Sequence, residues 1–196
     1  MIIPYYKNNL ITLYHGNCLE IMPQLDMTFD CCITDPPYGT TACKWDSVIP
    51  FEDMWKNLKK LVKPNGAICL FGSEPFSSAL RMSNLPMFKY DWVWVKNNKT
   101  GFLNAKKQPL RCIETISVFY EFQSLYIPQM KHGFTPYMTI NKTRTENYGS
   151  QRDNITISNG DRFPTFIMFL LFCGLLPHIL LFDQKTNNRF AGSGVP

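Results

Sequence analysis

The stretch Asp35-Pro36-Pro37-Tyr38-Gly39 follows a short apolar run, Phe29-Asp30-Cys31-Cys32-Ile33-Thr34. The run predicts a buried strand, and the two prolines must end it because proline has no N–H to give to a sheet. An acid, a rigid turn and an aromatic ring are therefore expected just beyond the carboxyl end of a strand. In open α/β sheets, that edge is where ligands bind.

The acid and the backbone of this turn suit a specific chemistry. The exocyclic amine of a nucleic-acid base is a poor nucleophile, because its lone pair is delocalised into the ring. Asp35 and the carbonyl of Pro36 are each expected to accept one N–H, which turns the lone pair toward an electrophile. Tyr38 offers a face on which an extruded base can stack. On these few residues alone, a plain Asp-Pro turn after a strand fits equally well.

The composition predicts one domain, or one domain with a small appendage. The 196-residue chain is 45% hydrophobic, so it can bury a core, and its net charge of +5 mildly favours an anionic partner. Its seven cysteines show no Cys-x-x-Cys pair and no zinc spacing, so we expect buried free thiols and no metal. An odd cysteine count without a disulfide framework and the absence of a visible signal peptide favour a cytoplasmic protein.

Strands and helices alternate in the first half of the chain. Apolar patterning predicts strands over 10–14, 29–34 and 67–71, and helices over 18–25, over 51–63 and for about ten residues from Pro75. Asn17 and Glu20 resemble a capping box, and Ser73 is the expected cap of the helix near Pro75. The order predicts an α/β fold with a parallel sheet. Within the loop 39–50, Lys44, Trp45 and Asp46 are interpreted as part of a lid.

Two further runs, Phe88–Val95 and Cys112–Tyr120, predict an antiparallel ribbon at the sheet edge. The alternation puts Phe88, Tyr90, Trp92 and Trp94 on one face, which is interpreted as core rather than as a platform for bases. No acid lies between Asp91 and Glu114. The cations of that interval either form a solvated loop or contact a phosphate backbone; they are Lys96, Lys99, Lys106, Lys107 and Arg111.

The last third of the chain contains a polar segment followed by an apolar one. Residues 123–162 are polar without clean periodicity, which fits an irregular nucleic-acid recognition region or a flexible insertion. Residues 166–182 are apolar except for His178. This segment is at the short limit for a membrane span; a core helix, a pair of strands and a tail translated out of frame are the alternatives. The glycines of Phe190-Ala191-Gly192-Ser193-Gly194 have the form of a turn that approaches a ligand.

Taken together, the motifs make residues 10–165 resemble bacterial and phage DNA adenine-N6 methyltransferases of the permuted (beta) class, part of the N6/N4 site-specific DNA methylases. In that class the catalytic motif precedes the cofactor motif. The matching pieces occur in the order of the family: Tyr14–Glu20, Thr34–Thr40, Trp45-Asp46, Gly66–Phe76, Phe102–Lys107 and Arg162-Phe163-Pro164.

The resemblance implies a Rossmann-like sheet with a reversed hairpin, S-adenosylmethionine as methyl donor, and a flipped adenine in double-stranded DNA. Carried over by position, Asp35, Pro36 and Tyr38 hold the target base. The cofactor would contact Asn17, Asp35, Phe71, Gly192 and Gly194, and the five cations named above would contact DNA. Asn17 stands where the family usually has Asp, so it keeps an acceptor but loses the charge.

The same resemblance divides the chain into a catalytic core over 1–121, a target-recognition region over 122–165 and an atypical apolar tail over 166–196. The family's His-Pro-Thr-Gln-Lys-Pro segment and its full glycine turn are not found after residue 165. A truncated or frame-shifted copy with an incomplete C-terminal part is therefore expected. Cytosine-N4 transfer, a non-catalytic DNA-binding remnant and a tail-anchored membrane protein are the alternatives, although Asp at position 35 favours adenine. We expect no membrane contact, and a homodimer stays open.

Overall fold

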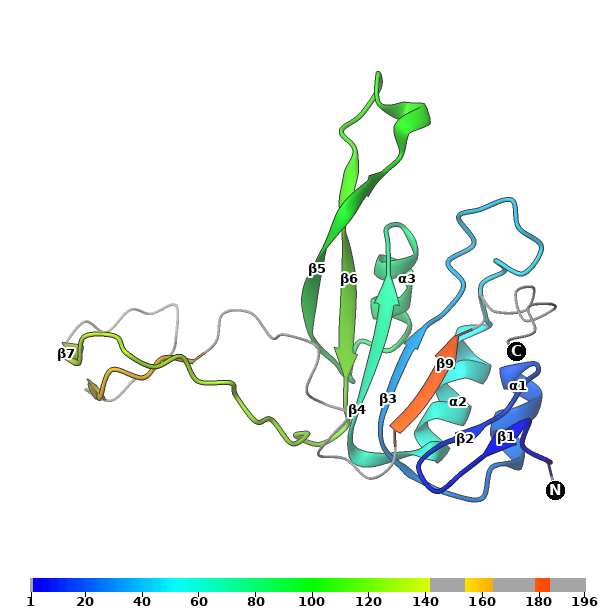
Figure 1. Cartoon of the computed structure of the whole chain (residues 1–196), viewed down its shortest axis with the longest axis horizontal. Helices are drawn as coiled ribbons and strands as arrows, with labels where there is room; N and C mark the ends of the chain where they lie inside the picture. Colours follow the sequence, from blue (N-terminus) through cyan, green and yellow to red (C-terminus); the bar gives the residue numbers. More distant parts are fainter. Residues whose placement is uncertain (1, 142–153, 164–178, 184–196) are drawn as a thin grey trace, which may run out of the picture. The chain divides into compact units, whose positions relative to one another are not determined.

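The computed structural model describes residues 2–141, 154–163 and 179–183. The chain divides into two compact units, one formed by 1–125 with 172–196 and the other by 126–171. The first unit is built on a five-stranded sheet of order β5-β6-β4-β3-β9 (Figure 1). The strand bounds are β3 Phe29–Asp35, β4 Val62–Gly72, β5 Phe88–Thr100, β6 Arg111–Phe119 and β9 Ile179–Asp183.

The sheet is mixed. β3 runs parallel to both β4 and β9, whereas β6 runs antiparallel to both β4 and β5. The strands expected over 29–34 and 67–71 and the antiparallel ribbon at the sheet edge are confirmed. The structure extends them, because β4 already begins at Val62 and β5 continues to Thr100.

Five described helical segments belong to this unit: α1 Cys18–Ile21, η1 Met22–Gln24, α2 Phe51–Leu61, α3 Phe76–Ser83 and η2 Phe102–Asn104. α2 forms where the apolar spacing predicts a helix, and its four apolar residues of that period are buried. Acidic residues occupy its first turn and lysines its last, which favours the helix through its dipole.

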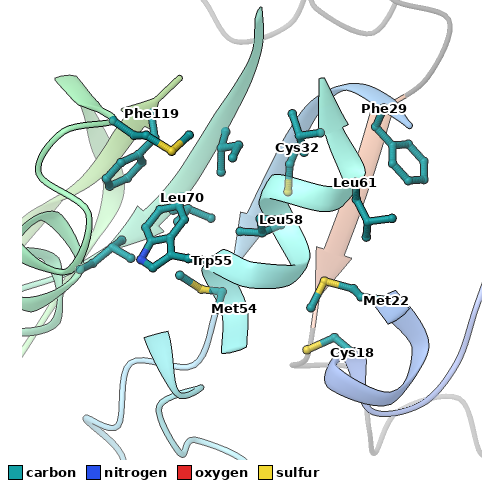
Figure 2. Packing of buried hydrophobic residues seen from close by; sticks show 14 of the residues in the cluster. Cys18, Met22, Phe29, Cys32, Met54, Trp55, Leu58, Leu61, Leu70 and Phe119 are labelled. Atoms are coloured by element: carbon teal, nitrogen blue, oxygen red, sulfur yellow. The ribbon is translucent and has the colours of Figure 1, made fainter. Parts of the chain in front are cut away.

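The segments α1, η1, α2 and α3 contribute to one core cluster on the sheet, whereas η2 lies at the exposed end of the β5–β6 hairpin. The main core cluster joins residues of α1, α2 and α3 to Cys32, Leu70 and Phe119 of the strands (Figure 2). A second cluster on the sheet consists of Cys69, Ile116, Val118 and Tyr120, and no described helix contributes to it. The buried cysteines of both clusters fit the expectation of buried free thiols.

The strand predicted over 10–14 is wrong as part of the main sheet. Only Thr12–Leu13 forms a strand, β2, and it pairs antiparallel with β1, Tyr6–Lys7, in a sheet of its own. Leu10, Ile11 and Leu13 stay exposed, so these apolar residues do not pack into the core.

Two predicted helix details also differ. The helix expected over 18–25 is split, because Pro23 lies in the first turn of the 3₁₀ segment η1. Ser73 does not cap α3 through its side chain. Instead, Glu74 Oε2 accepts hydrogen bonds from the backbone N–H and the hydroxyl of Ser78, at 3.2 and 2.7 Å. The charged acceptor satisfies the first turn in place of the serine.

The second unit contains an antiparallel pair, β7 Tyr137–Asn141 and β8 Asn154–Ser158. Lys131 and Arg162 exchange backbone hydrogen bonds, and the Arg162 guanidinium lies 4.1 Å from the ring centroid of Phe134. The described residues of this unit, 126–141 and 154–163, fall within the expected recognition region 122–165, whose role stays a prediction.

Most of the apolar segment 166–182 lies outside the described residues, but its end does not. Residues 179–183 form β9, a strand of the main sheet, so this part of the expected tail is continuous with the sheet. Within the part of the chain that the structure describes, no helix is long and apolar enough to cross a membrane.

Candidate active site

Three parallel strands end at one edge of the sheet and place the predicted site residues there. Asp35 is the last residue of β3, and its backbone lies beside that of Asp183 at the end of β9. Thr34 of β3 pairs with Leu70 of β4. The next residues, Asp35 and Phe71, therefore lie at the same level on these neighbouring strands. The structure therefore brings the acid of the Asp-Pro-Pro-Tyr turn to the carboxyl edge, as the sequence predicts.

Tyr38 turns back onto that acid. Its hydroxyl donates to Asp35 Oδ1 at 2.5 Å, and its ring stacks on Phe76 at 5.1 Å between centroids with 28° between the planes. Burial raises the pKa of Tyr38 well above its usual value, and the hydrogen bond to Asp35 and the nearby charges of Asp35, Glu114 and Asp46 raise it further. Tyr38 therefore acts as a neutral donor that fixes Asp35, and one ring face is supported from behind by Phe76.

A buried carboxylate holds the backbone that follows the turn. Asp46 is 8% exposed, and it accepts four backbone hydrogen bonds. Oδ1 accepts from the N–H groups of Tyr38 and Gly39 at 2.8 and 2.9 Å. Oδ2 accepts from those of Thr40 and Thr41 at 2.9 and 2.7 Å. We call residues 36–46 the clamped loop.

These contacts make Asp46 an anchor of the loop, whereas the sequence had suggested a lid. Burial raises the pKa of Asp46, but hydrogen bonds from the Thr41 hydroxyl and from the backbone N–H groups of Gly39, Thr41 and Tyr38 outweigh it and lower the pKa. The carboxylate is thus ionised at neutral pH. No local pattern predicts this contact, although Trp45-Asp46 is one of the pieces of sequence on which the resemblance to a family rests.

Asn17 performs the capping role predicted from its position. Its Oδ1 accepts from the N–H of Leu19 at 3.0 Å, and its Nδ2 donates to Glu20 Oε1 at 3.2 Å. The link between the two side chains departs from the usual capping box, in which each side chain bonds a backbone N–H. The expected contact of Asn17 with a cofactor stays a prediction.

Phe71 is half-buried at the end of β4, and Trp94 meets its ring edge-on, 5.8 Å away at 85°. The aromatic face of β5 is only in part the core that was predicted. Phe88 packs against the main cluster and Trp92 against the second, but Tyr90 is 37% and Trp94 48% exposed. The reason is that no described helix covers this side of the sheet. The remaining predicted cofactor residues, Gly192 and Gly194, lie outside the described residues.

The five predicted DNA-contacting cations separate into two groups. Lys96 forms an ion pair with Glu114 and lies 5.5 Å from the centroid of the Trp94 ring, so its charge is compensated. Lys99, Lys106, Lys107 and Arg111 are exposed on or near the end of the β5–β6 hairpin. Glu114 was not predicted as a site residue. Its negative charge contributes to the raised pKa of Tyr38.

A separate surface cavity of about 370 Å³ lies between α2 and the end of α3, lined by Trp55, Lys59, Ser83, Asn84 and neighbouring residues of α2. None of the predicted site residues lines it. Among the described residues, no group of three or more His, Cys, Asp or Glu side chains is placed to hold a metal ion.

Comparison with known proteins gives only partial likenesses. No family model and no curated protein matches the chain. The crystal structure of an M1.HpyAVI–SAM complex is 26% identical, with a TM-score of 0.43 over 59% of this chain and 56% of that chain. A crystal structure of M1.HpyAVI is 24% identical, with a TM-score of 0.36 over 53% of this chain and 51% of that one. This chain thus matches about half the length of those proteins, and the TM-scores are too low to establish its fold or activity.

Proposed function

We propose that the chain is a DNA methyltransferase that transfers a methyl group from S-adenosylmethionine to the N6 amine of an adenine flipped out of duplex DNA. The observation that carries the proposal is the turn at the carboxyl edge of β3. Asp35 is held by the hydroxyl of Tyr38, and the backbone behind it is held by Asp46. A site that must orient an amine by two hydrogen bonds needs this kind of fixed geometry.

The work of the chain in this reaction is to position the amine. Asp35 accepts one N–H and the carbonyl of Pro36 the other, which turns the nitrogen lone pair toward the methyl carbon. Tyr38 stacks on the base with its ring, one face of which is supported by Phe76. The Tyr38 hydroxyl donates to Oδ1 of Asp35, and a carboxylate can accept several hydrogen bonds, so the same side chain can be held by Tyr38 while it accepts from the amine.

The described residues at this edge fit the implied cofactor. S-adenosylmethionine supplies an electrophilic methyl group on a positively charged sulfur. The carboxylate of Asp35 favours a neighbouring cation, and Phe71 offers a half-buried aromatic ring for the adenosyl group. The antiparallel strand β6 between β4 and β5 supports the expectation of a reversed hairpin in a Rossmann-like sheet.

A non-catalytic DNA-binding remnant is the second candidate. It is favoured by one specific observation, namely the four exposed cations on the hairpin. Binding of DNA through these cations would not require a cofactor. The two candidates differ in whether the purified chain binds S-adenosylmethionine.

The test is a calorimetric titration of the purified chain with S-adenosylmethionine, followed by incubation with duplex DNA and the labelled cofactor. We expect saturable binding near one to one and label in N6-methyladenine. Asp35→Asn should lower methyl transfer about a hundredfold or more, and Tyr38→Phe about tenfold, because it keeps the ring but loses the hydrogen bond to Asp35.

Asp26→Asn is the matched control, since Asp26 is exposed in the loop before β3 and should leave the rate unchanged. A folded wild-type chain that binds DNA but neither binds the cofactor nor transfers the methyl group would overturn the proposal in favour of the remnant. Label in N4-methylcytosine would keep the reaction type and overturn the base.

A further inference from the structure

Two large apolar side chains are exposed to solvent at the end of the β5–β6 hairpin. Leu103 is 101% exposed and Phe102 is 68% exposed. We call residues 101–110 the hairpin tip. Single exposed apolar residues are common, but two adjacent ones at the end of a projecting hairpin indicate contact with a partner.

The hairpin tip is an ordered turn that presents these side chains together. Gly101 adopts a left-handed conformation with φ +93°, and Phe102–Asn104 form the 3₁₀ segment η2. The Asn104 N–H donates to the Gly101 carbonyl at 2.9 Å, and the N–H groups of Lys107 and Gln108 donate to the Asn104 carbonyl at 2.8 and 3.0 Å. Local backbone hydrogen bonds thus fix the turn.

The charges around the apolar pair all have one sign. Lys99, Lys106, Lys107 and Arg111 are exposed, and none of them forms an ion pair among the described residues. Within the described part of the chain, the Arg111 guanidinium contacts the hydroxyl of Ser73, at 3.5 Å. An apolar pair with four exposed cations within nine residues of it along the chain complements a polyanion that has an apolar interior.

The hairpin tip projects from the same edge of the sheet as Asp35. Thr115 of β6 pairs with Gly72, the last residue of β4. Arg111 lies four residues further out, or roughly 13 Å at the rise of an extended strand. The hairpin rises past the ends of β3 and β4 (Figure 1). A duplex whose base reaches Asp35 would therefore meet this tip along its side.

We propose that Phe102 and Leu103 form a wedge that enters the base stack of duplex DNA while the surrounding cations bind the adjacent phosphates. Apolar wedges of this kind unstack a base step, and the cost of unstacking is offset by contacts that the distorted duplex permits. The inference rests on the proposed function, because it assigns to the hairpin tip the duplex from which the base is flipped. An anionic membrane offers a similar complement, but the shared edge with Asp35 favours DNA.

The test uses the full chain and a mixed-sequence DNA duplex that contains 2-aminopurine, whose fluorescence rises when it is unstacked. Binding of the wild type should raise the fluorescence. The double variant Phe102→Ala/Leu103→Ala should bind about tenfold more weakly and abolish the rise, with an unchanged slope of log affinity against log salt concentration. Because both side chains are exposed, the variant should melt at the wild-type temperature.

The matched control is Lys106→Gln/Lys107→Gln. Loss of two phosphate contacts should reduce the salt slope by about two, while the fluorescence rise persists at saturating protein. Equal duplex affinity and equal fluorescence for the wild type and the double alanine variant would overturn the wedge. Loss of binding to phosphatidylserine vesicles, with duplex binding unchanged, would also overturn it and assign the tip to a lipid surface.

The outcomes also separate the wedge from the proposed function. Methyl transfer by the wild type together with unchanged binding by the double alanine variant overturns the wedge alone. A wedge effect on DNA binding without any methyl transfer by the wild type overturns the proposed function alone.

Discussion

The clamped loop and the hairpin tip both extend from the same edge of the sheet, yet they are held in opposite ways. In the clamped loop, one buried carboxylate accepts four backbone N–H groups. In the hairpin tip, neighbouring backbone groups bond one another, and two apolar side chains face solvent. The difference indicates that the loop serves to fix atoms, whereas the tip serves to present a surface.

Of the substitutions that test this difference between the two segments, Asp46→Asn should have the largest effect on stability. An amide has one acceptor oxygen, and its NH₂ group would face backbone N–H donors. We expect a loss of about 2–4 kcal/mol in the free energy of unfolding, measured by urea denaturation. Asp26→Asn, an exposed control, should stay within about 0.5 kcal/mol of the wild type. Equal stability of the two variants would show that the loop is not clamped.

A smaller effect should distinguish the glycines of the two segments. Gly39 has φ +68°, and a Cβ there would lie 3.0 Å from Cγ2 of Val48, whereas Gly101 has φ +93° and no atom within 4 Å of the same position. Gly101→Ala should cost about 1 kcal/mol from backbone strain alone, and Gly39→Ala about 2 kcal/mol from strain and crowding.

The background variant Val48→Ala sharpens the glycine test. Without the two methyl groups of Val48, Gly39→Ala should cost no more than Gly101→Ala, as measured by thermal unfolding. A Gly39→Ala penalty that stays the same in both backgrounds would place its cause in the backbone and not in the packing of the loop.

The smallest effect is on the acid side of the pH profile. The pKa of Asp46 is lowered in the folded chain, so its contribution to stability is complete above the unfolded value of about 3.9 and is lost as the pH falls through the folded value. Asp46→Asn should therefore lose less stability than the wild type when the pH is lowered below about 4. The free energy of unfolding of both proteins can be measured by chemical denaturation at each pH. An equal loss for both proteins below about pH 4 would contradict this prediction.

Some of the fold could be predicted because its signals are local. The spacing of Met54, Trp55, Leu58 and Leu61 predicts α2, and the apolar run before Asp35 predicts β3. Patterns over neighbouring residues report which face is buried, and both elements do pack on the core.

The errors arise where a distant contact outweighs a local preference. Leu10–Tyr14 has the composition of a strand, but its pairing partner is only the two-residue β1. Alternation predicts that Trp94 shares a face with Trp92, but not that the described helices leave that face uncovered. The anchor Asp46 could not be found in the same way, because its four partners lie five to eight residues back in an irregular loop.

The position of β9 has a consequence for how the chain folds. Its partner β3 begins at Phe29, so most of the chain must be made before Cys31 can pair with Ile179. Pairing between such distant segments slows folding, because the chain must lose the entropy of closing a long loop before the stabilising contacts form. Until then β3 is an apolar edge strand with unpaired backbone groups, the kind of surface on which chains associate during synthesis.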